Sequence, residues 1–174
     1  VCEMNHLILK DFLENLGLSS AQIVARKLGI GGSDAKIISE GDPVALNKLY
    51  EEKRGEIEPD DLNNVLAVMM GSYTEPLNAH YFQKQTGLEV TRRGESVLSK
   101  KFPFMRCTLD GFVFSEGAAW EAKHVGGFEP IEKIIHRYIP QLTHNMIVCG
   151  VFKAFLSVFI GSNKWHFEEI TLDS

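Results

Sequence analysis

Apolar residues recur at helical spacing through much of the first half of the chain. This periodicity predicts helices over residues 5–16, 19–26, 33–38, 42–54 and 59–86. Gly55 and Gly87 suit the ends of two of these segments, because glycine tolerates the left-handed backbone found there, and Ser33 is a suitable cap for the shortest one. Pro76 interrupts the longest run, so either one helix kinks at this residue or two helices meet there.

Short runs of alternating or β-branched residues dominate the second half. We expect strands over residues 89–99, 104–114, 117–123, 151–160 and 164–172, and helices from residue 129 and over residues 138–150. Gln141, His144 and Asn145 stand three and four positions apart on the second of these helices and so share a polar face. The order of helices and strands predicts an α/β or α+β sandwich.

The strands over residues 104–123 carry three charged side chains that fit poorly in a small apolar hairpin. Folding the hairpin about residues 115–116 places Asp110 opposite Glu121. Side chains alternate along a strand, so Glu121 and Lys123 share one face while Ala122 points to the other. Burying such charges is costly unless they are paired, which suggests that a divalent metal ion balances them.

An Asp followed by Glu-x-Lys supplies what a metal-dependent phosphodiesterase needs. Asp110, Glu121 and the Ala122 backbone carbonyl would offer the oxygen ligands that magnesium prefers. Water on such a metal is acidic enough to attack phosphorus, and Lys123 could orient it or neutralise the developing charge. This spacing also occurs by chance, so alone it does not decide for a nuclease.

Composition describes an ordinary globular chain. The 174 residues, 44% apolar and 24% charged, suit one domain over residues 1–174. We expect neither a membrane span nor a signal peptide, because no apolar run reaches about 18 residues and the apolar N-terminal segment is interrupted by charges. Cys2, Cys107 and Cys149 form no metal-binding pattern and favour a reducing cytoplasm.

Charge alone does not indicate a partner. A formal net charge of −5 argues mildly against nucleic acid, although carboxylates that hold metals would contribute to it. Basic residues occur in pairs at positions 26–27, 53–54, 92–93 and 100–101, which ordinarily form solvated surface. The glycine-rich turn over residues 29–32 is compatible with either a simple helix start or an anion site, and it matches neither nucleotide-binding fingerprint.

Five short motifs occur in a fixed order along the chain. They are Gly-Ile-Gly-Gly-Ser-Asp-Ala at residues 29–35, Gly-Ser-Tyr-Thr-Glu-Pro at 71–76, Thr-Leu-Asp-Gly at 108–111, Trp-Glu-Ala-Lys at 120–123 and Tyr-Ile-Pro-Gln at 138–141. Together they resemble the phage lambda exonuclease type of viral recombinase nuclease, within the PD-(D/E)XK superfamily. The resemblance extends over about residues 26–150.

The resemblance implies a restriction-endonuclease-like α/β fold, a central mixed sheet flanked by helices. It also implies an exonuclease that digests linear duplex DNA from 5′ to 3′, using Mg²⁺ or Mn²⁺ with two ions per site. By the same resemblance Asp110 and Glu121 are metal ligands, Lys123 is the catalytic lysine, Glu75 is a further acidic residue at the metal site, and Gln141 faces the site from a helix.

Arg26 and Ser33 fall where the resembled family holds the terminal 5′-phosphate. The implied role is to make single-stranded overhangs for a single-strand annealing recombinase, in the cytoplasm of a bacterial host and from a phage or prophage gene. A trimeric ring is also implied, but the short C-terminus argues against it. His124 follows the catalytic lysine where an arginine would assist the phosphate, and a structural role for this histidine is the simpler interpretation.

Two other interpretations remain open at the level of sequence. One is an endonuclease or nickase on the same fold, and the other is a DNA-end binding protein that has lost catalysis. The intact set of Asp110, Glu121 and Lys123 argues against the second. An iron–sulfur nuclease is not favoured, since three scattered cysteines do not supply four ligands.

Overall fold

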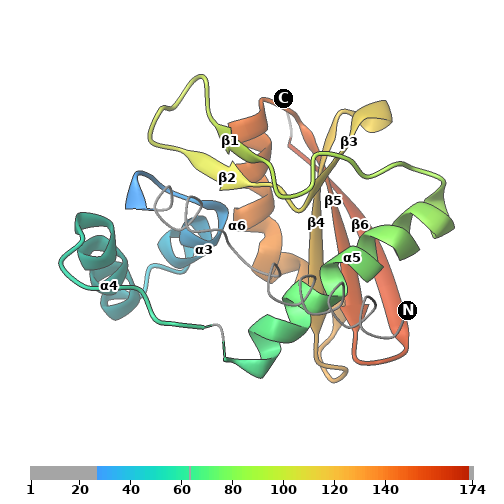
Figure 1. Cartoon of the computed structure of the whole chain (residues 1–174), viewed down its shortest axis with the longest axis horizontal. Helices are drawn as coiled ribbons and strands as arrows, with labels where there is room; N and C mark the ends of the chain where they lie inside the picture. Colours follow the sequence, from blue (N-terminus) through green and yellow to red (C-terminus); the bar gives the residue numbers. More distant parts are fainter. Residues whose placement is uncertain (1–26, 63, 173–174) are drawn as a thin grey trace, which may run out of the picture.

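Figure 1 shows the computed structural model, which describes residues 27–172 apart from residue 63. The helices predicted over residues 5–16 and 19–26, and Arg26 with them, lie outside the described residues. The elements are α3 (Gly32–Glu40), α4 (Pro43–Arg54), α5 (Leu66–Thr86), β1 (Ser96–Leu98), β2 (Arg106–Thr108), β3 (Gly111–Val113), the short 3-10 turn η1 (Phe114–Glu116), β4 (Ala118–Val125), α6 (Ile131–Cys149), β5 (Lys153–Ile160) and β6 (Lys164–Thr171).

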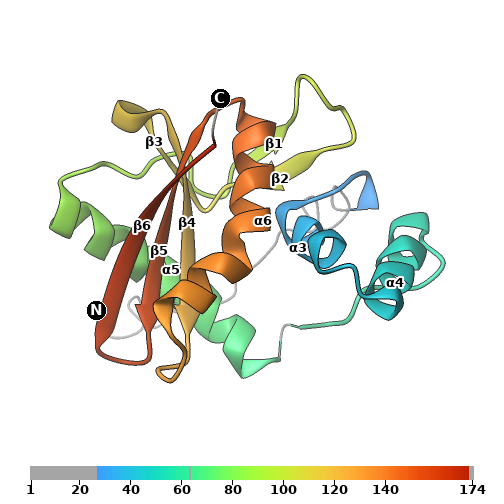
Figure 2. The same ribbon diagram turned by 180° about the vertical axis from the view of Figure 1, so that it is seen from behind.

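A four-stranded mixed sheet in the order β3-β4-β5-β6 forms the centre, with β4 and β5 parallel and the other pairs antiparallel. Helix α5 crosses one face and α6 covers the other (Figures 1 and 2). Two apolar clusters fill the layers, one around Phe82 and Trp120 on the α5 side and one around Leu142 and Met146 on the α6 side. The predicted α/β fold, a central mixed sheet flanked by helices, is confirmed.

Strand β4 lies inside this sandwich, and its first five residues are buried. Its register places Gly111 opposite Trp120, and one further step brings Asp110 opposite Glu121, as the hairpin pattern predicts. The predicted first strand is divided, because residues 106–108 pair with β1 whereas residues 111–113 pair with β4. Asp110 therefore lies where the chain passes from the small β1-β2 sheet to the central one.

Two predicted helix starts are wrong. Helix α3 begins at Gly32, so Ser33 lies inside the first turn, and the side chain of Asp34 instead accepts a hydrogen bond from the Gly31 N–H at 2.7 Å. Helix α5 begins at Leu66 rather than near residue 59, and it passes through Pro76 as one helix.

The two helices expected after residue 129 are one continuous helix, α6, which contains Pro140. Proline removes one hydrogen bond from a helix interior and would end a weakly packed helix. Here the apolar face of α6 packs on the sheet, with Ile134, Leu142 and Met146 fully buried. This packing on both sides of Pro140 holds the helix together.

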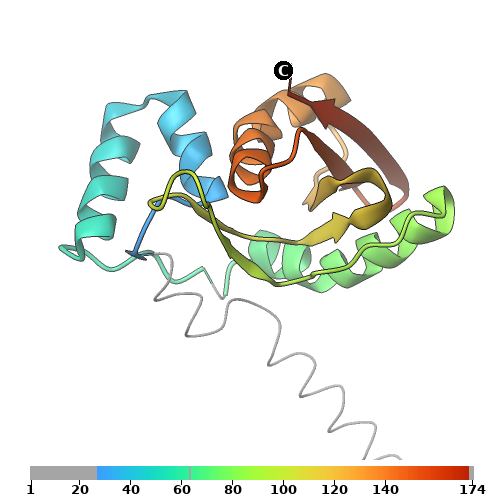
Figure 3. The ribbon, with the colours of Figure 1, turned by 90° about the horizontal axis from the view of Figure 1, so that it is seen from above.

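Helices α3 and α4 lie to one side of the layered part of the molecule (Figure 3). The turn before α3 is joined to the β1-β2 sheet, because the Ile30 N–H donates to the Phe104 carbonyl at 2.7 Å and the Arg106 N–H donates to the Ile30 carbonyl at 2.9 Å. A side chain at Gly29 would stand 2.4 Å from the Phe104 carbonyl oxygen, so this close approach needs a glycine. The arrangement fixes the start of α3 beside α6.

None of the helices in the described part of the chain combines the length and apolar character needed to cross a membrane.

Candidate active site

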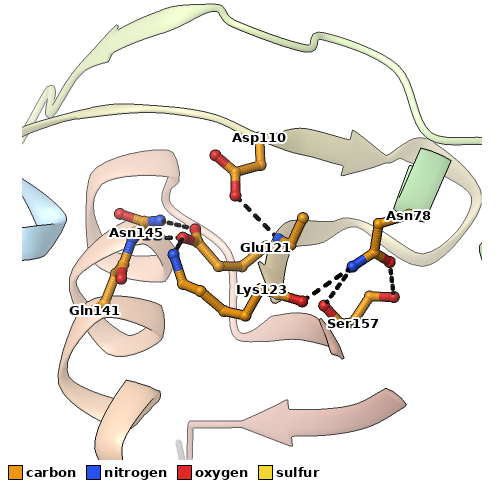
Figure 4. Close-up of polar contacts among 8 residues, drawn as sticks. Asn78, Asp110, Glu121, Lys123, Gln141, Asn145 and Ser157 are labelled. Carbon is orange, nitrogen blue, oxygen red and sulfur yellow. Dashed lines mark hydrogen bonds and ion pairs between the residues drawn. The ribbon is translucent and has the colours of Figure 1, made fainter. Parts of the chain in front are cut away.

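Strand β4 directs Glu121 and Lys123 toward α6, while Trp120 and Ala122 point into the apolar cluster on the α5 side. The alternation predicted for the hairpin is therefore observed. Figure 4 shows Asp110, Glu121 and Lys123 close together at the edge where β3 begins. The cluster is half enclosed: Glu121 is 2% exposed, and the side chain of Lys123 is 21% exposed.

Glu121 accepts hydrogen bonds from three side chains (Figure 4). Its Oε1 atom accepts from Lys123 Nζ at 2.6 Å and from Gln141 Nε2 at 2.5 Å, and its Oε2 atom accepts from Asn145 Nδ2 at 3.0 Å. Gln141 and Asn145 stand one turn apart on α6, as the polar-face pattern predicts. The third member of that pattern, His144, instead bonds the Arg106 carbonyl at 2.8 Å.

Asp110 is held by the backbone of β4. Its Oδ2 atom accepts a hydrogen bond from the Ala122 N–H at 3.0 Å. The N–H and C=O of one strand residue point to the same side of the strand, so the Ala122 carbonyl faces the edge that Asp110 occupies. Asp110, Glu121 and this carbonyl thus converge on one place, as the hairpin spacing predicts.

Glu75 approaches the same cluster from α5. The side chain of Arg93, in the loop before β1, lies 3.5 Å from Glu75 Oε1. Glu75 is partly buried rather than fully exposed. The charges of Asp110 and Lys123 both act on it, so the structure brings Glu75 near the predicted site without placing it in direct contact with the other two carboxylates.

Burial and the neighbouring charges together set the pKa values in the cluster. Burial, followed by the charge of Asp110, raises the pKa of Glu121 to about 8, and Lys123 only partly opposes this. Burial and Asp110 likewise raise the pKa of Glu75 to about 7 against the effect of Arg93. Burial disfavours the charge on Lys123, but Glu121 and Asp110 outweigh it, so the pKa of that ammonium is raised.

The pKa shifts and the available oxygen donors indicate whether a metal cation could bind in this cluster. Across residues 27–172, residue 63 excepted, no three His, Cys, Asp or Glu side chains form a ready-made metal cage. Asp110, Glu121 and the Ala122 carbonyl nevertheless supply hard oxygen donors, and each carboxylate oxygen can accept more than one partner. Burial and the charge of Asp110 raise the pKa values of Glu75 and Glu121, and a divalent cation bound there would favour their charged forms, so it suits this donor set.

The predicted phosphate site lies at the start of α3. Ser33 occupies the second position of the helix and is exposed. Asp34 is buried beside it and pairs with Lys53 at 2.5 Å. The backbone N–H groups of a first helical turn attract anions. This turn packs against α6 next to Gln141 and Asn145, so the structure brings Ser33 to the neighbourhood of the acidic cluster, whereas Arg26 is outside the described residues.

Sequence reasoning missed three residues that support the site. Asn145 was placed on the correct helix face but not assigned to Glu121. Arg93 belongs to a basic pair that the sequence predicts to be solvated surface, and only the tertiary fold brings it to Glu75. Asn78 is buried in α5 and donates to the Lys123 carbonyl at 3.3 Å and the Ser157 carbonyl at 3.0 Å, which fastens α5 to β4 and β5. Its signal in the sequence is a single Asn between apolar residues in the helical pattern.

His124 faces away from the acidic cluster. Its ring nitrogens lie 3.2 Å from the Thr74 hydroxyl and 3.0 Å from the Gly161 carbonyl oxygen. These contacts join β4 to α5 and to the turn after β5. They favour the structural interpretation of His124 over a role at the phosphate.

Comparisons with known proteins bear on the family to which the chain belongs. The model of the YqaJ-like viral recombinase domain matches residues 23–151. A protein of Bacillus subtilis (strain 168), "Uncharacterized protein YqaJ", is 31% identical over 163 residues, which are 87% of this chain and 49% of that protein. The chain thus spans about half the length of the curated relative it matches.

Two solved structures share the fold. The alkaline exonuclease LHK-Exo of Laribacter hongkongensis superimposes with a TM-score of 0.70 at 17% identity, covering 89% of this chain and 83% of that one. A phage-related exonuclease of Haemophilus somnus 129PT gives a TM-score of 0.61 at 15% identity, covering 92% and 82%. The family match and this shared fold confirm the resemblance read from the five motifs: the chain belongs to the YqaJ-like viral recombinase family.

Proposed function

We propose that this chain is one metal-dependent nuclease domain that digests linear double-stranded DNA from its 5′ end toward 3′. The observation that carries the proposal is the convergence of Asp110, Glu121 and Lys123 at one sheet edge, beside the first turn of α3. Family membership supports a nuclease acting on DNA. The solved complex of the Laribacter enzyme with dAMP supports the product class, since an exonuclease releases deoxynucleoside monophosphates.

Each residue has a distinct part in the proposed reaction. Asp110, Glu121 and the Ala122 carbonyl would hold Mg²⁺ or Mn²⁺, and Glu75 would contribute to a second ion. When bound, such ions supply an activated water and neutralise charge on the scissile phosphate. Lys123 stands beside Glu121, where its ammonium can orient the attacking water and stabilise the negative charge that develops. Gln141 keeps Glu121 turned toward this point.

End selection would come from the start of α3. Ser33 and the N–H groups of the first turn, with Arg26, would bind the terminal 5′-phosphate. Successive cuts then begin at the end of the strand and leave a 3′ single-stranded overhang. Such overhangs are substrates for a single-strand annealing recombinase, the partner we propose for phage-type recombination.

A comparison of DNA forms tests the proposed activity. Linear duplex with 5′-phosphates should be degraded in Mg²⁺, while a covalently closed circle of the same sequence should persist, because a circle offers no end to bind. Gel analysis of both forms, with EDTA as the control, measures this. Cutting of the circle would instead indicate an endonuclease or nickase, and binding of ends without any cutting would indicate a catalytically inactive end-binding protein.

The raised pKa values predict a pH-dependent response to metal. Burial and Asp110 raise the pKa of Glu75 to about 7 and the pKa of Glu121 to about 8, so below these pH values protons compete with a cation for the two carboxylates. The rise in Tm caused by 5–10 mM Mg²⁺, roughly the range that saturates a millimolar site, should be larger at pH 8.5 than at pH 6. Differential scanning fluorimetry without DNA measures it.

The same pKa shifts determine whether the metal-free protein gains or loses stability as the pH rises. A folded-state pKa above the unfolded value means that the folded state binds more protons between those two values, so stability falls as pH rises through that window. Here the window runs from about 4.5 to about 8. Asp110→Asn should flatten this decline, because it removes a charge that raises both pKa values. A Mg²⁺ response that is equal at both pH values would contradict the proposed ligands.

A further inference from the structure

Asn145 lies between the acidic cluster and the first turn of α3. It is 3% exposed, and its Nδ2 atom donates to Glu121 Oε2 at 3.0 Å. Its Oδ1 atom is buried and has no hydrogen-bond partner among the described residues. The amide is therefore turned so that its donor serves Glu121, and its oxygen points the other way.

That oxygen meets the backbone of α3 at Gly32. A β-carbon at Gly32 would stand 2.7 Å from Asn145 Oδ1 and 3.0 Å from Gln141 Cγ. Real β-carbons do not approach an oxygen so closely, so α3 can pack here only because residue 32 is glycine. The first turn of α3 and the carboxylate of Glu121 are thus separated by one planar side-chain amide.

A purely structural role explains this arrangement poorly. A buried amide oxygen without a partner is unfavourable, so the bond to Glu121 accounts for the nitrogen end of this side chain and leaves the position of its oxygen unexplained. The amide offers something that an apolar side chain does not. It is rigid and flat, so a displacement of its oxygen end by α3 must rotate its nitrogen end against Glu121.

We propose that Asn145 is a positioning residue that couples binding of the 5′-phosphate at the first turn of α3 to the orientation of Glu121. The inference rests on the proposed function, in which that turn receives the DNA end. A phosphate drawn to the N–H groups of the turn sets the position of Gly32. Because Asn145 contacts Gly32 and donates to Glu121, the position of Gly32 determines the orientation of this carboxylate, the proposed metal ligand. Binding of the DNA end would thus orient Glu121 for cutting.

The test compares two linear duplexes that differ only in their 5′ ends, phosphate against hydroxyl. The wild-type chain should digest the phosphorylated end on the order of tenfold faster, a ratio in the usual range of coupling between sites. Asn145→Ala should reduce this ratio to near one. Asn145→Asp should act similarly, because it keeps the oxygen beside Gly32 but loses the donor to Glu121.

Gly32→Ala tests the same contact independently, by changing α3 instead of Asn145. Its β-carbon would press on Asn145 Oδ1, so it too should lower the phosphate-to-hydroxyl ratio. In an Asn145→Ala background the nearest obstruction, the amide oxygen, is gone and only the looser contact with Gln141 Cγ at 3.0 Å remains, so Gly32→Ala should then cause little further loss. Non-additivity of this kind marks residues that act on one another. Asn47→Ala, an exposed asparagine on α4, is the matched control and should leave the ratio unchanged.

The outcomes separate the coupling from the proposed function. If the wild-type chain treats both ends alike, phosphate recognition fails and the coupling falls with it. If the wild-type chain discriminates and Asn145→Ala is slower on both ends with an unchanged ratio, Asn145 merely supports Glu121 and the coupling is overturned while the proposed function stands. Circular dichroism and Tm show whether each variant is folded. If Asn145→Ala does not fold, the phosphate-to-hydroxyl ratio of Gly32→Ala tests the coupling instead.

Discussion

Asp110→Asn should lower the rate of DNA digestion on the order of 10³-fold, while binding to linear duplex stays measurable. Asparagine keeps the shape of the side chain and its acceptor for the Ala122 N–H, which lies 3.0 Å away. It removes the negative charge that a divalent cation requires beside Glu121. Initial rates on 5′-phosphorylated linear DNA, together with a gel-shift assay in Ca²⁺, measure the two effects separately.

Stability provides the control for this substitution. Asp110 raises the pKa of both Glu75 and Glu121, so its neutralisation should make the metal-free protein at least as stable at pH 8 as the wild type. The loss of activity can then not be attributed to unfolding. Asp60→Asn, at an exposed aspartate that pairs with Lys48, should retain full activity. Digestion by Asp110→Asn at a wild-type rate would show that the metal site has been assigned wrongly.

Lys123→Met should reduce both activity and stability. We expect the rate to fall about 10²–10⁴-fold, because the group that orients water and offsets charge is lost. Glu121, which is 2% exposed, would lose its ion pair at 2.6 Å. Breaking a buried pair by removing one partner costs about 3–5 kcal/mol. The loss should be smaller at pH 6 than at pH 9, because Glu121 takes up a proton at the lower pH.

The double variant Lys123→Met with Glu121→Gln separates the two roles. It removes the unpaired buried charge and should recover much of the lost Tm, yet it should remain inactive because both chemical groups are missing. Urea denaturation at pH 6 and pH 9 measures the stability, and the assay on linear DNA measures the rate. A single Lys123→Met variant that cuts DNA normally would rule out the proposed catalytic lysine.

The local sequence pattern was sufficient to predict those features whose physical cause lies within a few residues. The register of the β3-β4 hairpin follows from its turn and from the alternation of side chains, and it correctly placed Asp110 opposite Glu121. The C-terminal ends of α4 and α5 follow from Gly55 and Gly87, which take the left-handed backbone there. The family followed from motif order, and the family comparison confirms it.

The local pattern did not predict where α5 begins or that α6 is one continuous helix. The periodicity predicts a helix from residue 59, but Val65 has an extended backbone and α5 begins only at Leu66. The sequence also predicts a new helix from about residue 138, but packing of α6 on the sheet carries one helix through Pro140. Propensity is a small term that such packing readily outweighs.

By itself the sequence determined the chemical groups of this site, Asp110, Glu121 and Lys123, and their arrangement along one hairpin, because strand alternation is a short-range property. Only the tertiary structure decided what surrounds them. Asn145 reaches Glu121 because α6 packs across the sheet, and Arg93 reaches Glu75 because the loop before β1 meets α5. Contacts between residues far apart in the chain depend on how whole elements pack, which no local periodicity encodes.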